Sequence, residues 1–232
     1  ELAKELKISK AKLLQIIESL HEANPMLGHR GCRLGITYPE ITEMQASAII
    51  KATKKLIKNG YSPMPEIMIP LVGNLGEFIH QKNIIEKILL QQNASSLNIK
   101  IGTMIELPRA CLIADQIAEY ADFISFGTND LTQTAFGFSR DDVGTFMPTY
   151  IDNHIIASDP FQVLDAEGVG ELIKIAIKKA KKTNPKIKIG VCGEHGGDPK
   201  SISFFNKMNF DYVSCSPFRV PVAFMSIAKN NL

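Results

Sequence analysis

The stretch of sequence that most constrains the fold is Ile99–Leu131, which reads IKIGTMIELPRACLIADQIAEYADFISFGTNDL. Two apolar runs typical of buried strands, Ile99–Ile105 and Asp122–Phe126, lead into polar or acidic residues, and the segment between them has the apolar spacing of a helix. A buried strand, a helix and a second buried strand make a parallel βαβ unit, in which both strands point the same way. The carboxyl ends of the two strands therefore lie at one edge of the sheet, where α/β proteins place their chemistry.

Acidic residues close both strands of this unit. Glu106 follows the first strand, and Asn129 and Asp130 follow the second. One or two carboxylates with open positions for substrate are the usual way in which proteins hold Mg²⁺, so Glu106 and Asp130 are the predicted metal ligands. Asn129 and the backbone N–H groups of Gly127 and Thr128 would add neutral donors for an anionic substrate oxygen. The alternatives are that local backbone donors satisfy the carboxylates and that Gly127 only makes a tight turn.

The rest of the chain repeats the alternation of strand and helix. Further strands are predicted at Glu66–Val72, Lys186–Glu194 and Asp211–Ser216, with a less regular sixth near His29–Arg33. Unbroken alternation in one core is the pattern of an α/β protein, either a (β/α)₈ TIM-type barrel or an open doubly wound sheet. A barrel needs eight strands, so this chain is about two short. The lack of a G-x-G-x-x-G motif after a strand argues against a dinucleotide site.

Helices between the strands are predicted from apolar spacing and from capping residues. Two short helices broken near Ile8–Ser9 occupy residues 2–22, and their predicted role is packing. Longer helices are predicted at Pro39–Lys58, Leu75–Gln91, Gly168–Thr183, Asp198 to about Met208, and Phe218–Lys229. The segment Thr132–Glu167 lacks clear periodicity, and an irregular segment of that length is expected to be a lid or a subunit contact.

Composition excludes several classes of function. The 232 residues carry a net charge of +2 with basic and acidic residues interspersed, so no patch suits nucleic acid or a membrane surface. Apolar runs are all shorter than the ~20 residues that span a bilayer, and the N-terminus has no signal-peptide core. The four cysteines are far apart, which argues against disulfides and structural zinc and favours a reducing compartment. We expect one domain over residues 1–232, and the helical start suggests a fragment or a processed product.

Other polar residues could take part in chemistry. Cys192 lies in GVCGE at the tip of a predicted strand, where its thiol could act as an acid or base if His195 or the metal tuned its pKa. A buried structural cysteine is the alternative. His195 could orient a carboxylate or cap the following helix. Arg30, Arg33 and Arg140 could bind phosphate or carboxylate, although Arg140 could equally form a surface ion pair.

Seven ordered motifs give the chain a resemblance to a known family. The motifs are NPMLGHRGCRLG, PEIMIPLVG, IGTMIELPRA, SFGTNDLTQ, FGFSRDDVG, VCGEHGGDP and VSCSPFRVP. In this order and spacing, over nearly the whole chain, they resemble the C-terminal phosphoenolpyruvate/pyruvate domain of the pyruvate, phosphate dikinase family. Phosphoenolpyruvate synthase and enzyme I of the sugar phosphotransferase system share the outline, but GHRGCRLG and GEHGGDP are most similar to the dikinases.

The resemblance implies a (β/α)₈ barrel and a role for each residue of the site. Mg²⁺ would be held by Glu106 and Asp130, and the proton donor would be Cys192. Arg30 is favoured over Arg33 as the substrate-binding arginine of the GHRGCR motif. The substrate-binding set then consists of these two acids together with Arg30, Gly127, Thr128, Asn129 and, as a candidate on its own chemistry, Arg140.

The resemblance also implies partners for this chain. In the family a phosphohistidine on a separate swivelling domain of the same full-length chain delivers or accepts the phosphoryl group, and an ATP-grasp domain charges that histidine. The chain would start after the first part of the barrel, so two family arginines would be absent and the barrel seam would be exposed or closed by a partner. We expect a homodimer in the cytoplasm or an organelle, and we expect that this segment alone cannot run the full reaction.

The implied reaction is ATP + pyruvate + phosphate = AMP + phosphoenolpyruvate + diphosphate. Mg²⁺ would acidify the pyruvate methyl group by stabilising the enolate, and arginines would neutralise the transferring phosphoryl group. In the reverse direction Cys192 would give a proton to carbon from one face. Two rival hypotheses remain: a metal-dependent aldolase or lyase that forms a pyruvate enolate without phosphate, and a non-catalytic fragment whose exposed seam serves assembly.

Overall fold

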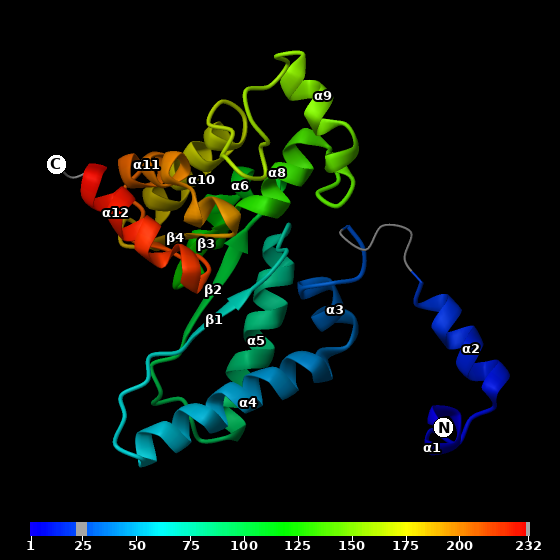
Figure 1. Ribbon diagram of the computed structural model, residues 1–232. Coiled ribbons are helices and arrows are strands. Elements are labelled where there is room, and N and C mark those ends of the chain that lie inside the picture. Colours follow the sequence, from blue (N-terminus) through cyan, green and yellow to red (C-terminus); the bar gives the residue numbers. More distant parts are fainter. Residues whose placement is uncertain (22–26, 231–232) are drawn as a thin grey trace.

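The computed structural model describes residues 1–21 and 27–230, and its centre is one parallel sheet. The five strands are β1 (Glu66–Ile69), β2 (Lys100–Ile105), β3 (Phe123–Gly127), β4 (Lys188–Cys192) and β5 (Tyr212–Val213). They lie side by side in the order β1-β2-β3-β4-β5 (Figure 1). Because this order never reverses, the sheet is a run of barrel strands and not a doubly wound sheet. The described residues leave the sheet open at β1 and β5, so the expectation of an incomplete barrel is confirmed.

The sixth strand expected near His29–Arg33 does not form, and that prediction was wrong. Residues 27–31 make an irregular turn in which Gly31 has a φ of +59°, and helix α3 (Cys32–Thr37) begins directly after it. A backbone hydrogen bond from the Cys32 N–H to the Pro70 carbonyl (3.2 Å) joins this turn to the end of β1. The positive φ at Gly31 breaks the extended backbone that a strand requires. Asn24–Met26, which open the motif, lie outside the described residues.

Helices form where apolar spacing predicted them. Those that match the predicted ranges are α1 (Leu2–Glu5), α2 (Lys10–Ser19), α4 (Pro39–Lys58), α5 (Leu75–Gln91), α10 (Val169–Thr183), α11 (Pro199–Lys207) and α12 (Val220–Asn230), the last preceded by the 3₁₀ turn η3 (Pro217–Arg219). Local signals explain the boundaries. For example, α5 begins with a capping box: Asn74 Oδ1 accepts from the Gly76 N–H, and Glu77 Oε2 accepts from the Asn74 N–H, each at 2.9 Å.

The helical connection between β2 and β3 is divided into two short helices. They are α6 (Pro108–Leu112) and α7 (Ala114–Ala118), which meet at Ile113, where φ is −113° and ψ is 20°. Their inward face is made almost wholly of small or branched apolar residues, and Ala110, Ala114 and Ile117 are fully buried. Small side chains let this connection pack closely against α10, its most extensive helical neighbour.

The segment predicted to be irregular, Thr132–Glu167, is partly helical. Its first residues belong to α8 (Thr128–Phe136), and η1 (Val143–Thr145) and α9 (Met147–Asp152) follow. A separate small cluster of buried apolar residues stabilises this segment: Val143, Met147 and Phe161, with Phe138, Phe146 and Tyr150 packed against them. Because the segment folds around its own small core, its apolar residues show no single period along the chain.

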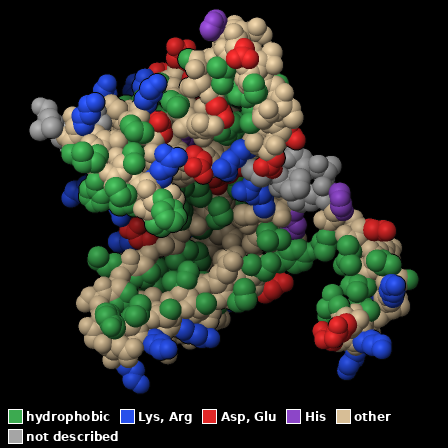
Figure 2. All heavy atoms as spheres, in the orientation of Figure 1, with side chains coloured by type: hydrophobic (Ala, Val, Ile, Leu, Met, Phe, Trp, Pro, Cys, Tyr) green, Lys and Arg blue, Asp and Glu red, His purple; other side chains and the backbone are tan. Residues whose placement is uncertain are grey.

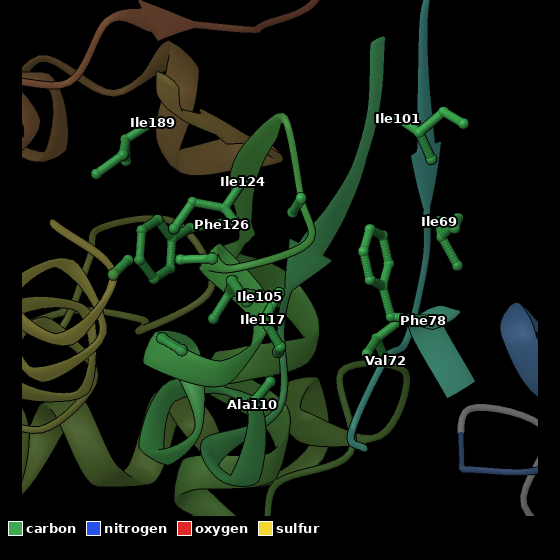
Figure 3. Packing of buried hydrophobic residues seen from close by; sticks show 14 of the residues in the cluster. Ile69, Val72, Phe78, Ile101, Ile105, Ala110, Ile117, Ile124, Phe126 and Ile189 are labelled. Atoms are coloured by element: carbon green, nitrogen blue, oxygen red, sulfur yellow. The ribbon is translucent and has the colours of Figure 1, made fainter. Parts of the chain in front are cut away.

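One apolar cluster fills the space between the sheet and its covering helices. Figure 3 shows side chains of neighbouring strands, Ile105 from β2, Ile124 and Phe126 from β3 and Ile189 from β4, packing near Ile117 of α7. Each of them is at least 99% buried. Burying one side chain of this size stabilises a fold by about 1.5–3 kcal/mol, so this cluster holds the strand ends in fixed relative positions.

The open edge of the sheet at β1 borders an apolar groove. It has a volume of about 550 Å³ and is lined by residues of β1, α3, α4 and α5, among them Ile67, Ile69 and Ile41. Figure 2 shows apolar side chains along this hollow. The groove corresponds to the exposed seam that an incomplete barrel is expected to have.

The first two helices do not have the packing role predicted for them within the described residues. Neither α1 nor α2 has a buried residue, and Leu6 and Leu20 are more than half exposed. Their apolar residues follow helical spacing, but the described part of the chain offers them no core. Among the described residues, every helix is too short or too polar to cross a membrane.

Candidate functional site

Three strands deliver polar residues to one edge of the sheet. Glu106 directly follows β2, Thr128–Asp130 form the first turn of α8 directly after β3, and Cys192 is the last residue of β4. The register pairs Ile105 with Phe126 and Gly127 with Cys192, so the three strands end level with one another. Parallel strands thus bring these groups to the carboxyl edge of the sheet, as their positions in the sequence predicted.

Glu106 is held in place by the backbone of the turn that follows β1. Its side chain is 97% buried, and its Oε1 accepts a hydrogen bond from the Leu71 N–H at 2.6 Å. Leu71 has a φ of +58°, a left-handed conformation that is uncommon for a residue with a Cβ. The turn after Pro70 therefore aims a backbone donor at the carboxylate, and sequence reasoning did not identify it. The signal was Pro70, which marks the strand end.

The environment of Glu106 favours its neutral form. Burial raises the pKa of Glu106 to about 7, and the negative charge of Asp130 acts in the same direction. The Leu71 N–H and the charges of Arg30 and Arg33 oppose this rise without cancelling it. A divalent cation bound to Glu106 would offset the unfavourable effects of burial and of the Asp130 charge on its ionised form.

Gly127 allows Glu106 to lie against the end of β3. A Cβ at Gly127 would lie 2.2 Å from Glu106 Oε2 and 2.6 Å from Met104 Cε. Such a contact is impossible without a shift of the carboxylate. Gly127 is therefore explained by the close approach of the Glu106 carboxylate to its backbone, and not by a tight turn.

Asp130 pairs with one of the two candidate arginines of the first motif. Arg30 Nη1 lies 3.6 Å from Asp130 Oδ1, and both side chains are partly accessible. Arg33 Nη1 instead donates to the carbonyl oxygens of Leu27 and Gly28, each at 2.9 Å. Arg30 is thus the arginine directed to the acidic edge, and Arg33 stabilises the turn that carries it.

Asn129 contributes an unsatisfied amide. Its Oδ1 is buried and has no hydrogen-bond partner among the described residues. The amide packs beside Gly193, where a Cβ would lie 3.2 Å from Asn129 Nδ2 and where φ is +104°. Buried polar atoms are almost always paired, so this oxygen is available for a ligand.

Cys192 presents a half-buried, protonated thiol beside these groups. Burial raises the pKa of Cys192, the charges of Glu106 and Asp130 add to the rise, and the Ser125 hydroxyl opposes it. Sγ lies 3.7 Å from the Phe126 carbonyl oxygen, to which the thiol can donate. A neutral thiol is suited to giving up a proton. Sequence reasoning missed Ser125, because a serine inside an apolar strand resembles core.

Tuning of the Cys192 thiol by His195 was proposed from the sequence, but the contacts of His195 are different. Its Nδ1 lies 2.7 Å from Thr128 Oγ1 and its Nε2 lies 2.8 Å from the Pro160 carbonyl oxygen. The helix cap that was the alternative role belongs to Asp198, whose Oδ2 accepts from the Ser201 N–H at 2.7 Å. His195 therefore neither orients a carboxylate nor caps the helix. Its ring contacts Thr128 and the Pro160 carbonyl instead.

Arg140 lies outside the set of groups that contact one another at the acidic edge. Its Nη2 is 3.6 Å from Glu194 Oε1, and both side chains are more than a third exposed. It lines a polar groove of about 480 Å³ together with Arg219 and Asp159. The surface ion pair that was the alternative for Arg140 is thus observed, on a loop that neighbours the site.

The donor set fits a small divalent cation with open positions. Two carboxylates and one unpaired amide oxygen come from residues at this edge, and hard oxygen ligands are those that Mg²⁺ prefers. The described residues contain no group of three His, Cys, Asp or Glu side chains that could enclose a metal ion.

Fold and site together define a barrel-type α/β domain with an acid pair and a thiol at its carboxyl edge. A family model described as "PEP-utilising enzyme, PEP-binding domain" matches residues 3–232. The chain belongs to this family of phosphoenolpyruvate-utilising enzymes.

Named relatives agree with the family assignment. The chain is 54% identical over 232 residues to "Pyruvate, phosphate dikinase 1, chloroplastic" from Arabidopsis thaliana, and 53% identical to "Pyruvate, phosphate dikinase 2" from Zea mays. These alignments cover 99% of this chain but only 24% and 26% of the relatives. The chain therefore spans about a quarter of the length of the curated relatives that it matches.

A solved structure shares the fold. A citrate lyase from Burkholderia xenovorans LB400 superposes with a TM-score of 0.53 at 12% identity, covering 80% of this chain and 53% of that one. At this level of identity the likeness concerns the fold alone, and it agrees with the arrangement of barrel strands described above.

Proposed function

We propose that this chain is the phosphoenolpyruvate/pyruvate domain of a pyruvate, phosphate dikinase, a transferase that interconverts pyruvate and phosphoenolpyruvate. The observation that carries the proposal is the convergence of Glu106, Asp130 and Cys192 at the ends of three adjacent strands. Identity of more than half with named dikinases over 99% of the chain supports it.

Glu106 and Asp130 are the proposed ligands of Mg²⁺. Bound there, the cation would supply Lewis-acid stabilisation for negative charge on the keto oxygen of the substrate. Glu106 Oε1 already accepts from Leu71, which leaves Oε2 to face the β3 end and a ligand. Burial and the charge of Asp130 both disfavour ionised Glu106. A bound cation would stabilise that ionised form.

Substrate is proposed to bind against the first turn of α8. The N–H groups of Gly127, Thr128 and Asn129 are suited to an anionic oxygen because they lie at a helix N-terminus beside the acids. Arg30 would neutralise carboxylate or phosphoryl charge. Arg140 would reach the substrate only after leaving Glu194, so its role is the more distant one.

Cys192 is proposed to move the proton at carbon. In the direction of pyruvate formation, the thiol gives its proton to the methylene carbon of the enolate, and in the other direction the thiolate takes a methyl proton. The raised pKa of Cys192 keeps the thiol protonated near neutral pH, as a proton donor requires.

The remaining chemistry is assigned to partners of this domain. A phosphohistidine domain elsewhere in the full-length chain would exchange the phosphoryl group, and ATP and phosphate would charge it. Relatives four times as long leave room for such domains. We also propose a homodimer. All four cysteines of this chain are free, which supports a reducing compartment, either the cytoplasm or an organelle.

The rival hypotheses are less well supported. A pyruvate aldolase or lyase would need the same acids, but the named relatives are dikinases, and the likeness to a citrate lyase concerns the fold alone. A non-catalytic role for the isolated segment is compatible with the apolar groove at β1. It concerns the segment by itself and not the full-length protein.

Exchange of pyruvate methyl protons for deuterium tests the proposal in the full-length protein with Mg²⁺. Proton NMR should show exchange in the wild type and a loss of about 100-fold or more in Cys192→Ala. Cys215→Ala is the matched control, since Cys215 is also free and half-buried, and it should exchange like the wild type. Equal exchange in Cys192→Ala and wild type would remove Cys192 from its role.

A further inference from the structure

His195 is a buried titratable group for which the proposed reaction has no task. Its side chain is fully buried, in the 3₁₀ turn η2 (Glu194–Gly197) that follows Cys192. Both ring nitrogens contact other segments, Nδ1 at Thr128 Oγ1 (2.7 Å) and Nε2 at the Pro160 carbonyl (2.8 Å). The imidazole therefore connects three segments: the start of α8, the loop before α10, and the turn after β4.

The partners determine which tautomer is present. The Pro160 carbonyl can only accept, so Nε2 carries a hydrogen and donates it. Burial lowers the pKa of His195 and keeps the ring neutral, against the opposing effects of the Pro160 carbonyl and of nearby carboxylates. These carboxylates are Asp198, Asp159 and Glu194. In a neutral ring Nδ1 is then an acceptor, and the Thr128 hydroxyl is the donor.

The Thr128 hydroxyl has a second acceptor within reach. The Cys192 carbonyl oxygen lies 3.2 Å from Thr128 Oγ1, compared with 2.7 Å for His195 Nδ1. One hydroxyl hydrogen makes one strong hydrogen bond, and the shorter contact is to the imidazole. Thr128 is fully buried, so loss of this acceptor would turn the hydroxyl toward the backbone of Cys192.

We propose that His195, as its neutral Nε2–H tautomer, is a positioning residue that fixes Thr128 relative to Cys192. Its effect on catalysis rests on the proposed function, because the backbone around Thr128 faces the substrate and Cys192 moves the proton. Through Thr128 and Pro160 the imidazole holds the donor turn and the thiol strand at a constant separation. A difference of a few tenths of an ångström here changes the alignment of thiol and carbon.

Two substitutions at His195 separate positioning from packing. In His195→Asn, the side chain oxygen lies near the place of Nδ1 and still accepts from Thr128, but the contact to Pro160 is lost. In His195→Gln, an N–H lies near the place of Nε2 and still donates to Pro160, but the acceptor for Thr128 is lost. Each variant deletes one of the two hydrogen bonds.

The test measures pyruvate methyl exchange in the full-length protein. We expect the exchange rate of His195→Gln to be at least roughly 10-fold below that of His195→Asn. In the Thr128→Val background the two substitutions should no longer differ, because the hydroxyl that distinguishes them is absent. Equal losses in both variants, or a difference that persists in Thr128→Val, would overturn the proposal.

A second measurement does not depend on the reaction. In protein labelled with ¹⁵N-histidine, His195 should show a protonated Nε2 and an unprotonated Nδ1 near neutral pH, and Thr128→Val should move the Nδ1 resonance. A protonated Nδ1, or an Nδ1 signal unaffected by Thr128→Val, would contradict the assignment. If the wild type fails to exchange methyl protons, the proposed function fails, and this spectrum still decides the role of His195.

Discussion

The Leu71 N–H donates a hydrogen bond of 2.6 Å to the buried carboxylate of Glu106, across the end of the sheet from β1 to β2. This single contact stabilises the ionised form of an acid whose surroundings otherwise favour the neutral form, since burial and Asp130 raise the pKa of Glu106 to about 7. Ionised Glu106 therefore destabilises the metal-free protein, and a bound cation would stabilise its charge.

Glu106→Gln should therefore stabilise the metal-free protein at high pH. The folded-state pKa of about 7 is above the usual value of 4.5, so the native state binds a proton that the unfolded state has released. Native stability due to Glu106 is fully present below pH 4.5 and falls as the pH rises through 7. Above that range we expect the variant to gain about 1–3 kcal/mol over the wild type.

Calorimetric unfolding in chelator, at about pH 5 and about pH 8, measures this difference. Gln retains a side-chain oxygen that can accept from Leu71, so the comparison isolates the charge. A variant less stable than the wild type at the higher pH would show that the carboxylate is already compensated without metal.

Gly127→Ala should displace the Glu106 carboxylate. The new Cβ would lie 2.2 Å from Oε2, so the side chain must move and metal affinity should fall by roughly 10-fold or more. Gly144→Ala is the matched control, because a Cβ there meets no atom within 4 Å. Isothermal titration with Mg²⁺ compares the two, and equal affinities would mean that Glu106 does not bind the cation through Oε2.

Asp130→Asn should weaken Mg²⁺ binding by at least about 10-fold, because an amide oxygen is a poorer ligand than a carboxylate and one negative charge is lost. The exposed Asp142, on the loop after α8, provides a control of the same chemistry, and Asp142→Asn should bind like the wild type. Mn²⁺ binding followed by electron paramagnetic resonance gives both affinities. Unchanged affinity in Asp130→Asn would separate this acid from the metal.

The alkylation of Cys192 should be slow near neutral pH and rise steadily with pH, because burial and two carboxylates raise its pKa above the usual 9.0. Glu106→Gln removes one of these charges, so its Cys192 should react faster than that of the wild type above about pH 7, where Glu106 is ionised. Mass spectrometry of the Cys192 peptide after timed iodoacetamide treatment in chelator measures this. A rate that levels off below neutral pH would contradict the raised pKa.

The sequence predicted the fold where local patterns decide it. The strands at β2 and β3, the helices α4 and α5 and the edge that gathers Glu106 and Asp130 all follow from apolar periodicity and the direction of parallel strands. The expected strand near His29–Arg33 failed, because the left-handed Gly31 and the start of α3 cannot be recognised from composition.

Contacts between segments far apart in the sequence were beyond reach. The donor at Leu71 depends on a backbone dihedral, and the partners of His195 are 67 and 35 residues away. The order of residues does not reveal such contacts, whereas the end of a strand is marked by the change from apolar to polar residues. The sequence therefore placed the candidate acids and the thiol at the strand ends, but it did not identify the groups that orient them.

Anomalous diffraction from crystals of the full-length protein soaked with Mn²⁺ and pyruvate is the most direct test of the central claim, that two strand-end acids share one cation next to a thiol. We predict one anomalous peak in contact with oxygens of both Glu106 and Asp130, with the pyruvate methyl carbon facing Cys192 Sγ. A peak elsewhere, or pyruvate bound with its methyl group turned away from that sulfur, would contradict it.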